Sequence, residues 1–164
     1  MNKKVIFLLL ALMLPVLVFI FLKYFGKNEF VVAPLFQTEK VVPPTGCFEI
    51  SIPYFISDSA YSFIKQGHET DSLLIIFYSG MSKDLIASDI QIARVQESFP
   101  PETGVRIKQI PQVEKLVECS LLLQSPKDLV LVDEKKRIRG QYSSNDRDEV
   151  DRLMTELDII LKRY

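Results

Sequence analysis

The chain has 164 residues, with 20 Lys and Arg against 21 Asp and Glu and a formal net charge of −1. Its basic residues are scattered among acidic ones, which argues against a nucleic-acid-binding protein, because such proteins present a basic patch. The two cysteines, Cys47 and Cys119, form neither a Cys-x-x-Cys motif nor a zinc-ligand spacing.

The N-terminal segment is the most apolar part of the chain. Residues 5–22 are eighteen consecutive uncharged residues, interrupted only by Pro15, and about 17–25 such residues cross a bilayer as a helix. A cleaved signal peptide is the alternative, but no small-x-small cleavage site follows. We therefore predict a single transmembrane helix, an anchor over residues 1–25 that contacts membrane lipid. The slightly more positive N-terminal tail favours a cytoplasmic N-terminus, with the remaining chain outside the cytoplasm.

The next segment, residues 26–46, contains Pro34, Pro43 and Pro44 and shows no helical periodicity. It is predicted to be an extended stalk. The folded domain is expected over residues 47–164. It opens with an alternating, strand-like run at residues 48–52, which a proline ends.

A strand–helix–strand unit is predicted next. Residues 73–78 are apolar on both faces, as in a central strand of a sheet that is covered on both sides. Ser82 is placed to cap a helix over residues 83–99, and a second strand is expected over residues 105–110. A helix of this length between two strands predicts a right-handed crossover and parallel strands. The side chains of the helix predicted to face the sheet are Leu85, Ile86, Ile92, Ala93 and Phe99.

The C-terminal part is predicted to form a short helix, a hairpin and a long helix. The short helix covers residues 113–119, and residues 129–132 pair with residues 137–142 as an antiparallel hairpin. Apolar residues then recur every three and four positions from Val150 to Tyr164, after a cap at Ser144 or Asn145. This order of elements predicts an α/β, thioredoxin-like fold, which is a mixed sheet flanked by helices.

The sequence leaves the state of the cysteines open. A structural disulfide between Cys47 and Cys119, two buried thiols and a working redox pair all fit two distant cysteines. His68, the only histidine, lies in a polar segment and is predicted to be solvated.

Residues 129–142 (LVLVDEKKRIRGQY) and 149–153 (EVDRL) together resemble the C-terminal third of the Sco/SenC family. Residues 52–55 and 75–78 fit the same resemblance. Members of that family are membrane-anchored, thioredoxin-like copper chaperones that help to assemble cytochrome c oxidase. The resemblance implies a thioredoxin-like fold and a role in respiratory oxidase assembly.

The chain departs from that family at the copper site. Copper-binding members carry a Cys-x-x-x-Cys pair in the loop after the strand that matches residues 75–78, and a histidine before the hairpin. Here Gly80 and Asp84 stand where the sulfurs belong, and residues 123–128 contain no histidine. Since Cu(I) selects thiolate and thioether ligands, copper loading and thiol exchange at this loop are disfavoured. The degenerate loop is instead predicted to be a partner surface; it consists of Ser79, Gly80, Met81, Ser82, Lys83 and Asp84.

The sequence thus predicts a non-catalytic accessory protein, with no catalytic, cofactor-binding or metal-binding residue assigned. It is expected in the bacterial inner membrane, with a periplasmic domain and an oxidase subunit or assembly factor as partner. Two alternatives are a thiol oxidoreductase that uses Cys47 and Cys119, and a copper chaperone with relocated ligands among Met81, His68 and the cysteines.

Overall fold

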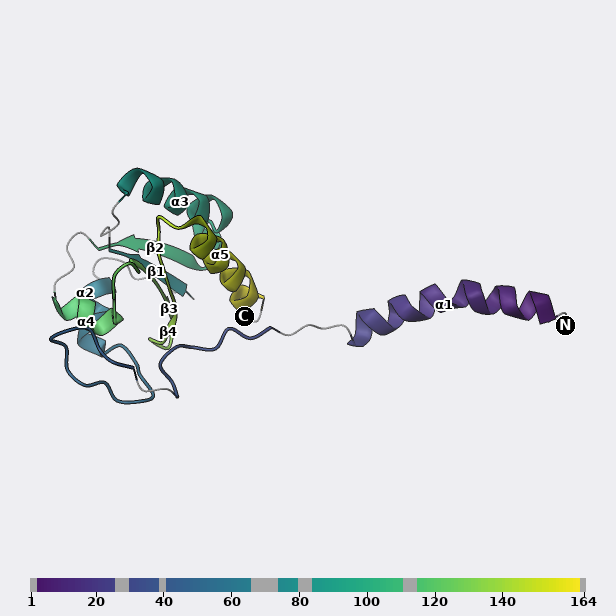
Figure 1. Cartoon of the computed structure of the whole chain (residues 1–164), viewed down its shortest axis with the longest axis horizontal. Coiled ribbons are helices and arrows are strands. Elements are labelled where there is room, and N and C mark those ends of the chain that lie inside the picture. Colours follow the sequence, from purple (N-terminus) through teal and green to yellow (C-terminus); the bar gives the residue numbers. More distant parts are fainter. Residues whose placement is uncertain are drawn as a thin grey trace. The chain divides into compact units, whose positions relative to one another are not determined.

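A computed structural model of the chain describes residues 3–25, 30–38, 41–65, 74–79, 84–110 and 115–162 (Figure 1). The chain divides into two compact units, Met1–Val31 and Val32–Tyr164. The first unit holds one helix, and the second holds the sheet and the other helices.

In the first unit, helix α1 covers Lys3–Phe25 and contains Pro15. Its described side chains, those of Lys3, Lys4 and residues 11–24, are exposed. Within the described residues, no helix is both long enough and apolar enough to cross a membrane. The structure gives no support of its own to the predicted transmembrane anchor.

The second unit is built on a four-stranded mixed sheet of order β2-β1-β3-β4. Strand β1 (Leu74–Tyr78) runs parallel to β2 (Val105–Gln109) and antiparallel to β3 (Leu129–Asp133). Strand β4 (Ile138–Tyr142) pairs with β3 as an antiparallel hairpin. Helix α3 (Leu85–Ser98) and the short 3-10 helix η1 (Pro101–Thr103) connect the two parallel strands. The predicted parallel crossover and hairpin are both confirmed.

Helices cover both faces of this sheet (Figure 1). Helices α2 (Asp58–Lys65) and α4 (Lys115–Leu121) lie on one face, and α3 and α5 (Arg147–Leu161) lie on the other. The predicted mixed sheet flanked by helices is confirmed.

The side chains of β1 alternate between these two faces. Ile75 and Phe77 pack in the core under α2 and α4, whereas Leu74, Ile76 and Tyr78 pack under α3 and α5. The whole strand is buried, as expected for an apolar run in the middle of a covered sheet.

A bulge in β4 lets one strand supply both cores. The pairing with β3 shifts between Leu131, which faces Gly140, and Val132, which faces Ile138, so Arg139 is the extra residue. Ile138 therefore packs in the core under α2 and α4, while Tyr142 packs in the core under α3 and α5.

The charged β3–β4 turn is organised by Asp133, whose side chain is fully buried. Its Oδ1 accepts hydrogen bonds from the backbone N–H groups of Lys135 and Arg137, both at 3.0 Å. Its Oδ2 pairs with the guanidinium of Arg137 at 2.7 Å and with that of Arg139 at 3.5 Å. The acidic and basic residues of the turn thus satisfy one another inside the fold.

The predicted stalk over residues 26–46 needs correction. The domain unit begins at Val32, because the segment that follows binds the edge of the sheet. Leu35 N–H donates to the carbonyl of Ile138 at 2.8 Å, and Arg139 Nη2 donates to the carbonyl of Val32 at 2.7 Å. Residues 32–35 thus line the edge of β4, which would otherwise be open.

The predicted strand at residues 48–52 was wrong, since these described residues form no strand. None of these residues pairs with a strand of the sheet. Instead, this stretch lies in the chain segment between Phe36 and Tyr54, whose two ends are held together by hydrogen bonds. Tyr54 N–H donates to the carbonyl of Phe36 at 3.0 Å, and Gln37 Nε2 donates to the carbonyl of Tyr54 at 2.9 Å.

The two long helices of the second unit, α3 and α5, each begin at an aspartate that was not the predicted cap. Asp84, not Ser82, is the N-cap of α3, and its carboxylate accepts from Ala87 N–H at 3.0 Å. Asp146, not Ser144 or Asn145, is the N-cap of α5. The buried residues of α5, namely Val150, Leu153, Leu157 and Ile160, agree with the predicted periodicity.

Candidate functional site

The predicted partner loop follows β1, and only its two ends are described. Gly80, Met81, Ser82 and Lys83 lie outside the described residues. At one end Ser79 is buried, and its N–H donates to the carbonyl of Asp128 at 3.0 Å. At the other end Asp84 caps α3. The loop therefore begins and ends on rigid elements.

A buried polar network lies directly under these ends. Asp128 is 2% exposed, and Ser88 and Ser144 are fully buried. Asp128 Oδ1 accepts from Ser144 N–H at 2.6 Å, and Ser144 Oγ donates to Asp128 Oδ2. The hydroxyls of Ser144 and Ser88 are in contact, and Ser88 Oγ donates to the Tyr78 hydroxyl at 2.7 Å.

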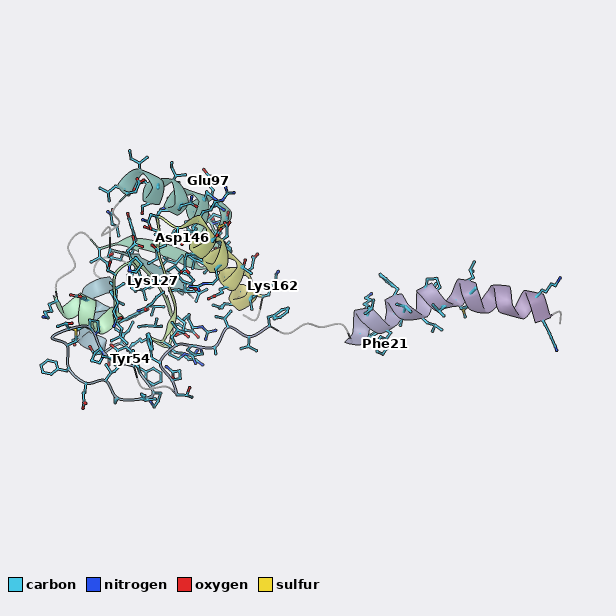
Figure 2. The ribbon with its side chains drawn as sticks, viewed as in Figure 1. Phe21, Tyr54, Glu97, Lys127, Asp146 and Lys162 are labelled. Atoms are coloured by element: carbon cyan, nitrogen blue, oxygen red, sulfur yellow. A yellow bond between two sulfur atoms is a disulfide. The ribbon has the colours of Figure 1, made fainter. Side chains whose placement is uncertain are left out.

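The network connects four separate parts of the domain. Tyr78 ends β1, Ser88 lies in the first turn of α3, Asp128 precedes β3 and Ser144 follows β4. Next to it, Lys127 (labelled in Figure 2) pairs with Glu149 of α5 at 2.5 Å. The end of the sheet next to the predicted partner loop is thus fixed by side-chain hydrogen bonds as well as by packing.

The number of protons in this network depends on the state of Asp128. If Ser144 donates to Asp128 and Ser88 donates to Tyr78, the contact between the two serines has no proton left. A protonated Asp128 supplies one, because it donates to Ser144 and frees the Ser144 hydroxyl to donate to Ser88. An ionised Asp128 requires Tyr78 to donate to Ser88 instead. Burial raises the pKa of the Asp128 carboxyl, and the hydrogen bonds from Ser144 act in the opposite direction.

This network has the chemistry of a structural element. Its hydroxyls and its carboxyl are buried and bonded to one another, so they have no access to a substrate. No sequence pattern predicts this network, because Ser144 fits a helix cap and Ser88 and Asp128 belong to no motif.

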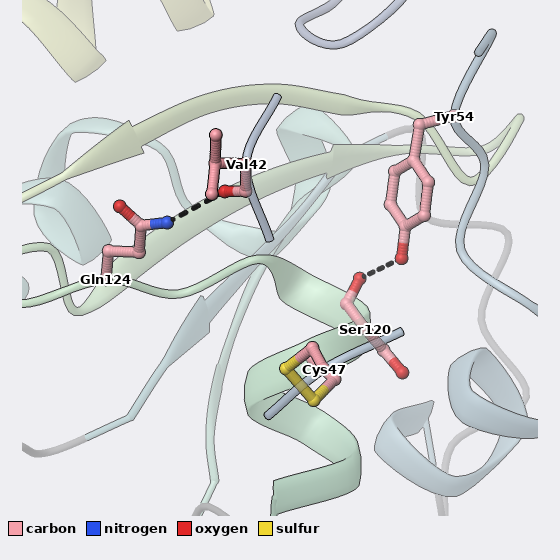
Figure 3. The surroundings of a disulfide bond; sticks show 6 residues. Val42, Cys47, Tyr54, Ser120 and Gln124 are labelled. Atoms are coloured by element: carbon pink, nitrogen blue, oxygen red, sulfur yellow. Dashed lines mark hydrogen bonds between the residues drawn. A yellow bond between two sulfur atoms is a disulfide. The ribbon is translucent and has the colours of Figure 1, made fainter. Parts of the chain in front are cut away.

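The two cysteines are joined. Cys47 and Cys119 form a disulfide with a Cα–Cα distance of 5.4 Å across 72 residues of sequence (Figure 3). The bond ties the segment between Phe36 and Tyr54 to α4. Two hydrogen bonds in the same region hold these segments together: Gln124 Nε2 donates to the carbonyl of Val42 at 3.2 Å, and the Tyr54 hydroxyl donates to the carbonyl of Ser120 at 2.8 Å.

The same cysteines are also candidate ligands of the alternative copper site. Among the residues that the structure describes, no three His, Cys, Asp or Glu side chains are placed to share a metal ion. Both cysteines are in the disulfide, and a disulfide lacks the thiolates that Cu(I) prefers. Met81 and His68, the other predicted donors, lie outside the described residues.

The start of α3 presents apolar side chains to solvent. Leu85, Ile86 and Ile90 are 56%, 76% and 57% exposed. The prediction that Leu85 and Ile86 face the sheet was wrong, since the buried residues of α3 are Ser88 and Val95. The buried side of α3 is marked by Ser88 and Val95, which are seven residues apart, and one of these two residues is polar, so the apolar pattern alone did not identify it. Ile86 and Ile90 are one turn apart and lie on the side of α3 that faces away from the sheet.

These exposed side chains lie immediately after the predicted partner loop. An exposed isoleucine is common by itself, but a cluster of exposed apolar side chains is typical of an interaction surface. Comparison with protein-family models, with curated proteins and with solved structures finds no match to this chain.

Proposed function

We propose that this chain is a membrane-anchored binding protein that takes part in respiratory cytochrome oxidase assembly without catalysing a reaction. Its domain is thioredoxin-like and periplasmic, and α1 holds it to the bacterial inner membrane. The oxidase pathway comes from the resemblance of residues 129–142 to the Sco/SenC family alone.

The order of the elements supports a thioredoxin-like domain. A parallel strand–helix–strand unit is followed by a helix, an antiparallel hairpin and a last helix, and the strand order is β2-β1-β3-β4. Fold alone does not give function, so the activity has to be argued from the site.

Membrane attachment is supported by the sequence of α1. About 17–25 consecutive apolar residues cross a bilayer as a helix. Residues 5–22 of this helix include no charged residue.

A binding role without catalysis is supported by what surrounds the partner loop. At the described ends of the loop, Asp84 caps α3 and Asp128 is hydrogen-bonded to Ser144. The two cysteines are paired with each other at α4, on the opposite face of the sheet from α3. The observation that carries the proposal is the exposed apolar side chains of Ile86 and Ile90 beside this loop. Burial of such residues is what stabilises the centre of a protein–protein interface.

The test is capture of the tagged full chain from solubilised bacterial membranes. We expect oxidase subunits or assembly factors in the captured material, and we expect the combined Ile86→Glu and Ile90→Glu substitution to remove them. Glu97→Lys, at an exposed site further along α3 (Figure 2), is the matched control and should retain them. Capture of no oxidase component by the unaltered chain would refute the proposal.

A second function is favoured by the disulfide itself. Cys47 and Cys119 are both partly exposed, so a thiol oxidoreductase that cycles this pair is the alternative. It requires a reduction potential near that of the surrounding redox partners, whereas structural disulfides typically lie below about −300 mV. Equilibration of the full chain against glutathione and then against dithiothreitol separates the two functions.

A further inference from the structure

Strand β2 forms one edge of the sheet. Within the described residues it pairs with β1 and with no other strand (Figure 1). The opposite edge, that of β4, is lined by residues 32–35. An edge strand presents a row of backbone N–H and C=O groups that can pair with another chain. Among the described residues, nothing lines the edge of β2 as residues 32–35 line that of β4.

The backbone groups on this edge belong to alternate residues of β2. Ile110 N–H donates to the carbonyl of Tyr78 at 2.8 Å, and every second residue of a parallel strand bonds to the same neighbour. The even-numbered residues of β2 therefore bond to β1, and the N–H and C=O groups of Ile107 and Gln109 point away from it. No described residue bonds to these outward groups.

The side chains of β2 make one face of the edge positive and the other apolar. Arg106 and Lys108 lie opposite Ile75 and Phe77 of β1, so they project on the face that is covered by α2 and α4. Ile107 projects on the other face and packs against the core under α3 and α5. The Arg106 side chain is exposed. A strand beside β2 would thus meet a cation on one face and an apolar side chain on the other.

We propose that the edge of β2 binds an extended segment of a partner protein in which acidic and apolar residues alternate. The backbone of the segment pairs with the outward groups of Ile107 and Gln109, and its acidic side chains lie beside Arg106. The inference goes beyond the proposed function, because it assigns a second binding surface and depends neither on α1 nor on the exposed side of α3.

The hydrogen-bonding groups of the edge determine the conformation of the occupant. A helix satisfies its backbone groups internally, whereas a strand presents them at the spacing of a β-ladder. Strand β2 has five residues, which is an ordinary length for a strand pair. In this mode of recognition the main-chain bonds give affinity and the alternating side chains give specificity.

The charges of β2 argue against a second copy of this chain as the occupant. If two β2 strands pair antiparallel around Ile107, Arg106 of one chain lies opposite Lys108 of the other on the same face. Pairing around Arg106 or Lys108 places that cation opposite its own copy. Like charges directly opposite each other destabilise a strand pair, whereas opposite charges stabilise it. An acidic segment therefore fits this edge better than the chain itself does.

The test compares the binding of two labelled peptides to the full chain in mild detergent, measured by fluorescence anisotropy. One short peptide alternates glutamate with valine, and the other alternates lysine with valine. We expect the glutamate peptide to bind at least about tenfold more tightly than the lysine peptide. We expect Arg106→Glu to reverse this preference, because the charge that selects the peptide is then inverted.

Two variants at Gln109 test the backbone pairing itself. Gln109→Pro removes an outward N–H but no bond to β1, and the proline ring blocks the approach of a paired strand. Gln109→Ala removes the same exposed side chain and keeps the N–H, so it is the matched control. We expect Gln109→Pro to weaken binding of the glutamate peptide at least about tenfold and Gln109→Ala to retain it. Circular dichroism establishes that each variant folds, and if Gln109→Pro does not fold, the charge reversal at Arg106 decides.

Three results overturn the inference. Equal affinity for the two peptides, or binding of neither, means that the cations of β2 only protect the edge from pairing. Equal affinity of the Gln109→Pro and Gln109→Ala chains for the glutamate peptide means that the backbone of β2 takes no part. Self-association of the unaltered chain in sedimentation, abolished by Gln109→Pro, means that a second copy occupies the edge. None of these results bears on the exposed side of α3, which the capture experiment tests separately.

Discussion

Removal of the Cys47–Cys119 disulfide should strongly destabilise the domain. The bond closes a loop across 72 residues, and the chain-entropy relation for a loop of this size gives a loss of about 4 kcal/mol in the free energy of unfolding. The disulfide also holds the segment around Cys47 against α4. The hydrogen bond from Gln124 to the carbonyl of Val42 should therefore weaken in the same variant.

The assay is guanidinium unfolding of the full chain in mild detergent, followed by circular dichroism. The combined Cys47→Ala and Cys119→Ala chain is compared with the unaltered chain and with Phe48→Ala. The last removes an exposed side chain next to the bond without touching it, and should change the free energy of unfolding by no more than about 0.5 kcal/mol. A loss below about 1 kcal/mol in the double variant would refute the loop-closure argument.

The contribution of the disulfide to the free energy of unfolding also determines its reduction potential. By a thermodynamic cycle, a disulfide that stabilises the fold by about 4 kcal/mol has a reduction potential roughly 90 mV lower in the folded than in the unfolded chain. A folded chain whose disulfide is reduced by the glutathione pool without loss of structure would instead favour the oxidoreductase.

Three further predictions concern the core and the cysteines. Gly140→Ala should destabilise the domain by about 1–3 kcal/mol in guanidinium unfolding, because a Cβ at Gly140 would overlap the ring of Tyr142. That ring is fully buried and its hydroxyl is bonded to Glu156, so it has little room to move. A neutral effect would contradict this packing. Asp128→Asn should gain stability relative to the unaltered chain as the pH rises from about 4 to 7. The reason is that burial raises the pKa of Asp128 in the folded chain, so the stability that its protonated form contributes below the unfolded pKa is lost as the pH rises through the folded pKa. Urea titrations at four pH values measure the difference in free energy of unfolding between the two chains. A difference that stays constant with pH would rule out the shift. The oxidised full chain should bind no stoichiometric Cu(I) against a competing chelator, since both sulfurs are in the disulfide; tight copper at one equivalent would restore the chaperone alternative.

Local patterns predicted much of the sheet and its covering helices. The apolar run at residues 73–78, the break after it and the alternation in the hairpin each act over a few residues, and they identified β1, β3 and β4. The periodicity from Val150 to Ile160 likewise identified the buried side of α5.

Features that depend on distant contacts were not predictable in the same way. Residues 32–35 have the composition of a linker, and only their bonds to Ile138 and Arg139 make them part of the domain. The buried network brings Asp128, Ser144 and Ser88 together from three segments, and no spacing within one segment signals it. The pairing of the cysteines across 72 residues was open for the same reason.

The buried side of α3 was predicted wrongly because it includes a polar residue. The apolar pattern placed Leu85 and Ile86 against the sheet, whereas the structure buries Ser88 and Val95 and exposes both Leu85 and Ile86. This error concerned the surface on which the proposed function depends.

Site-specific photo-crosslinking from that surface tests the central claim most directly. A photoreactive amino acid is placed at Ile86 or, as the control, at Glu97 of the full chain in intact bacterial membranes, and the crosslinked proteins are identified. The account predicts that position 86 crosslinks to a respiratory oxidase subunit or assembly factor and that position 97 does not. Crosslinks to no such protein from position 86, or equal crosslinks from both positions, would contradict it.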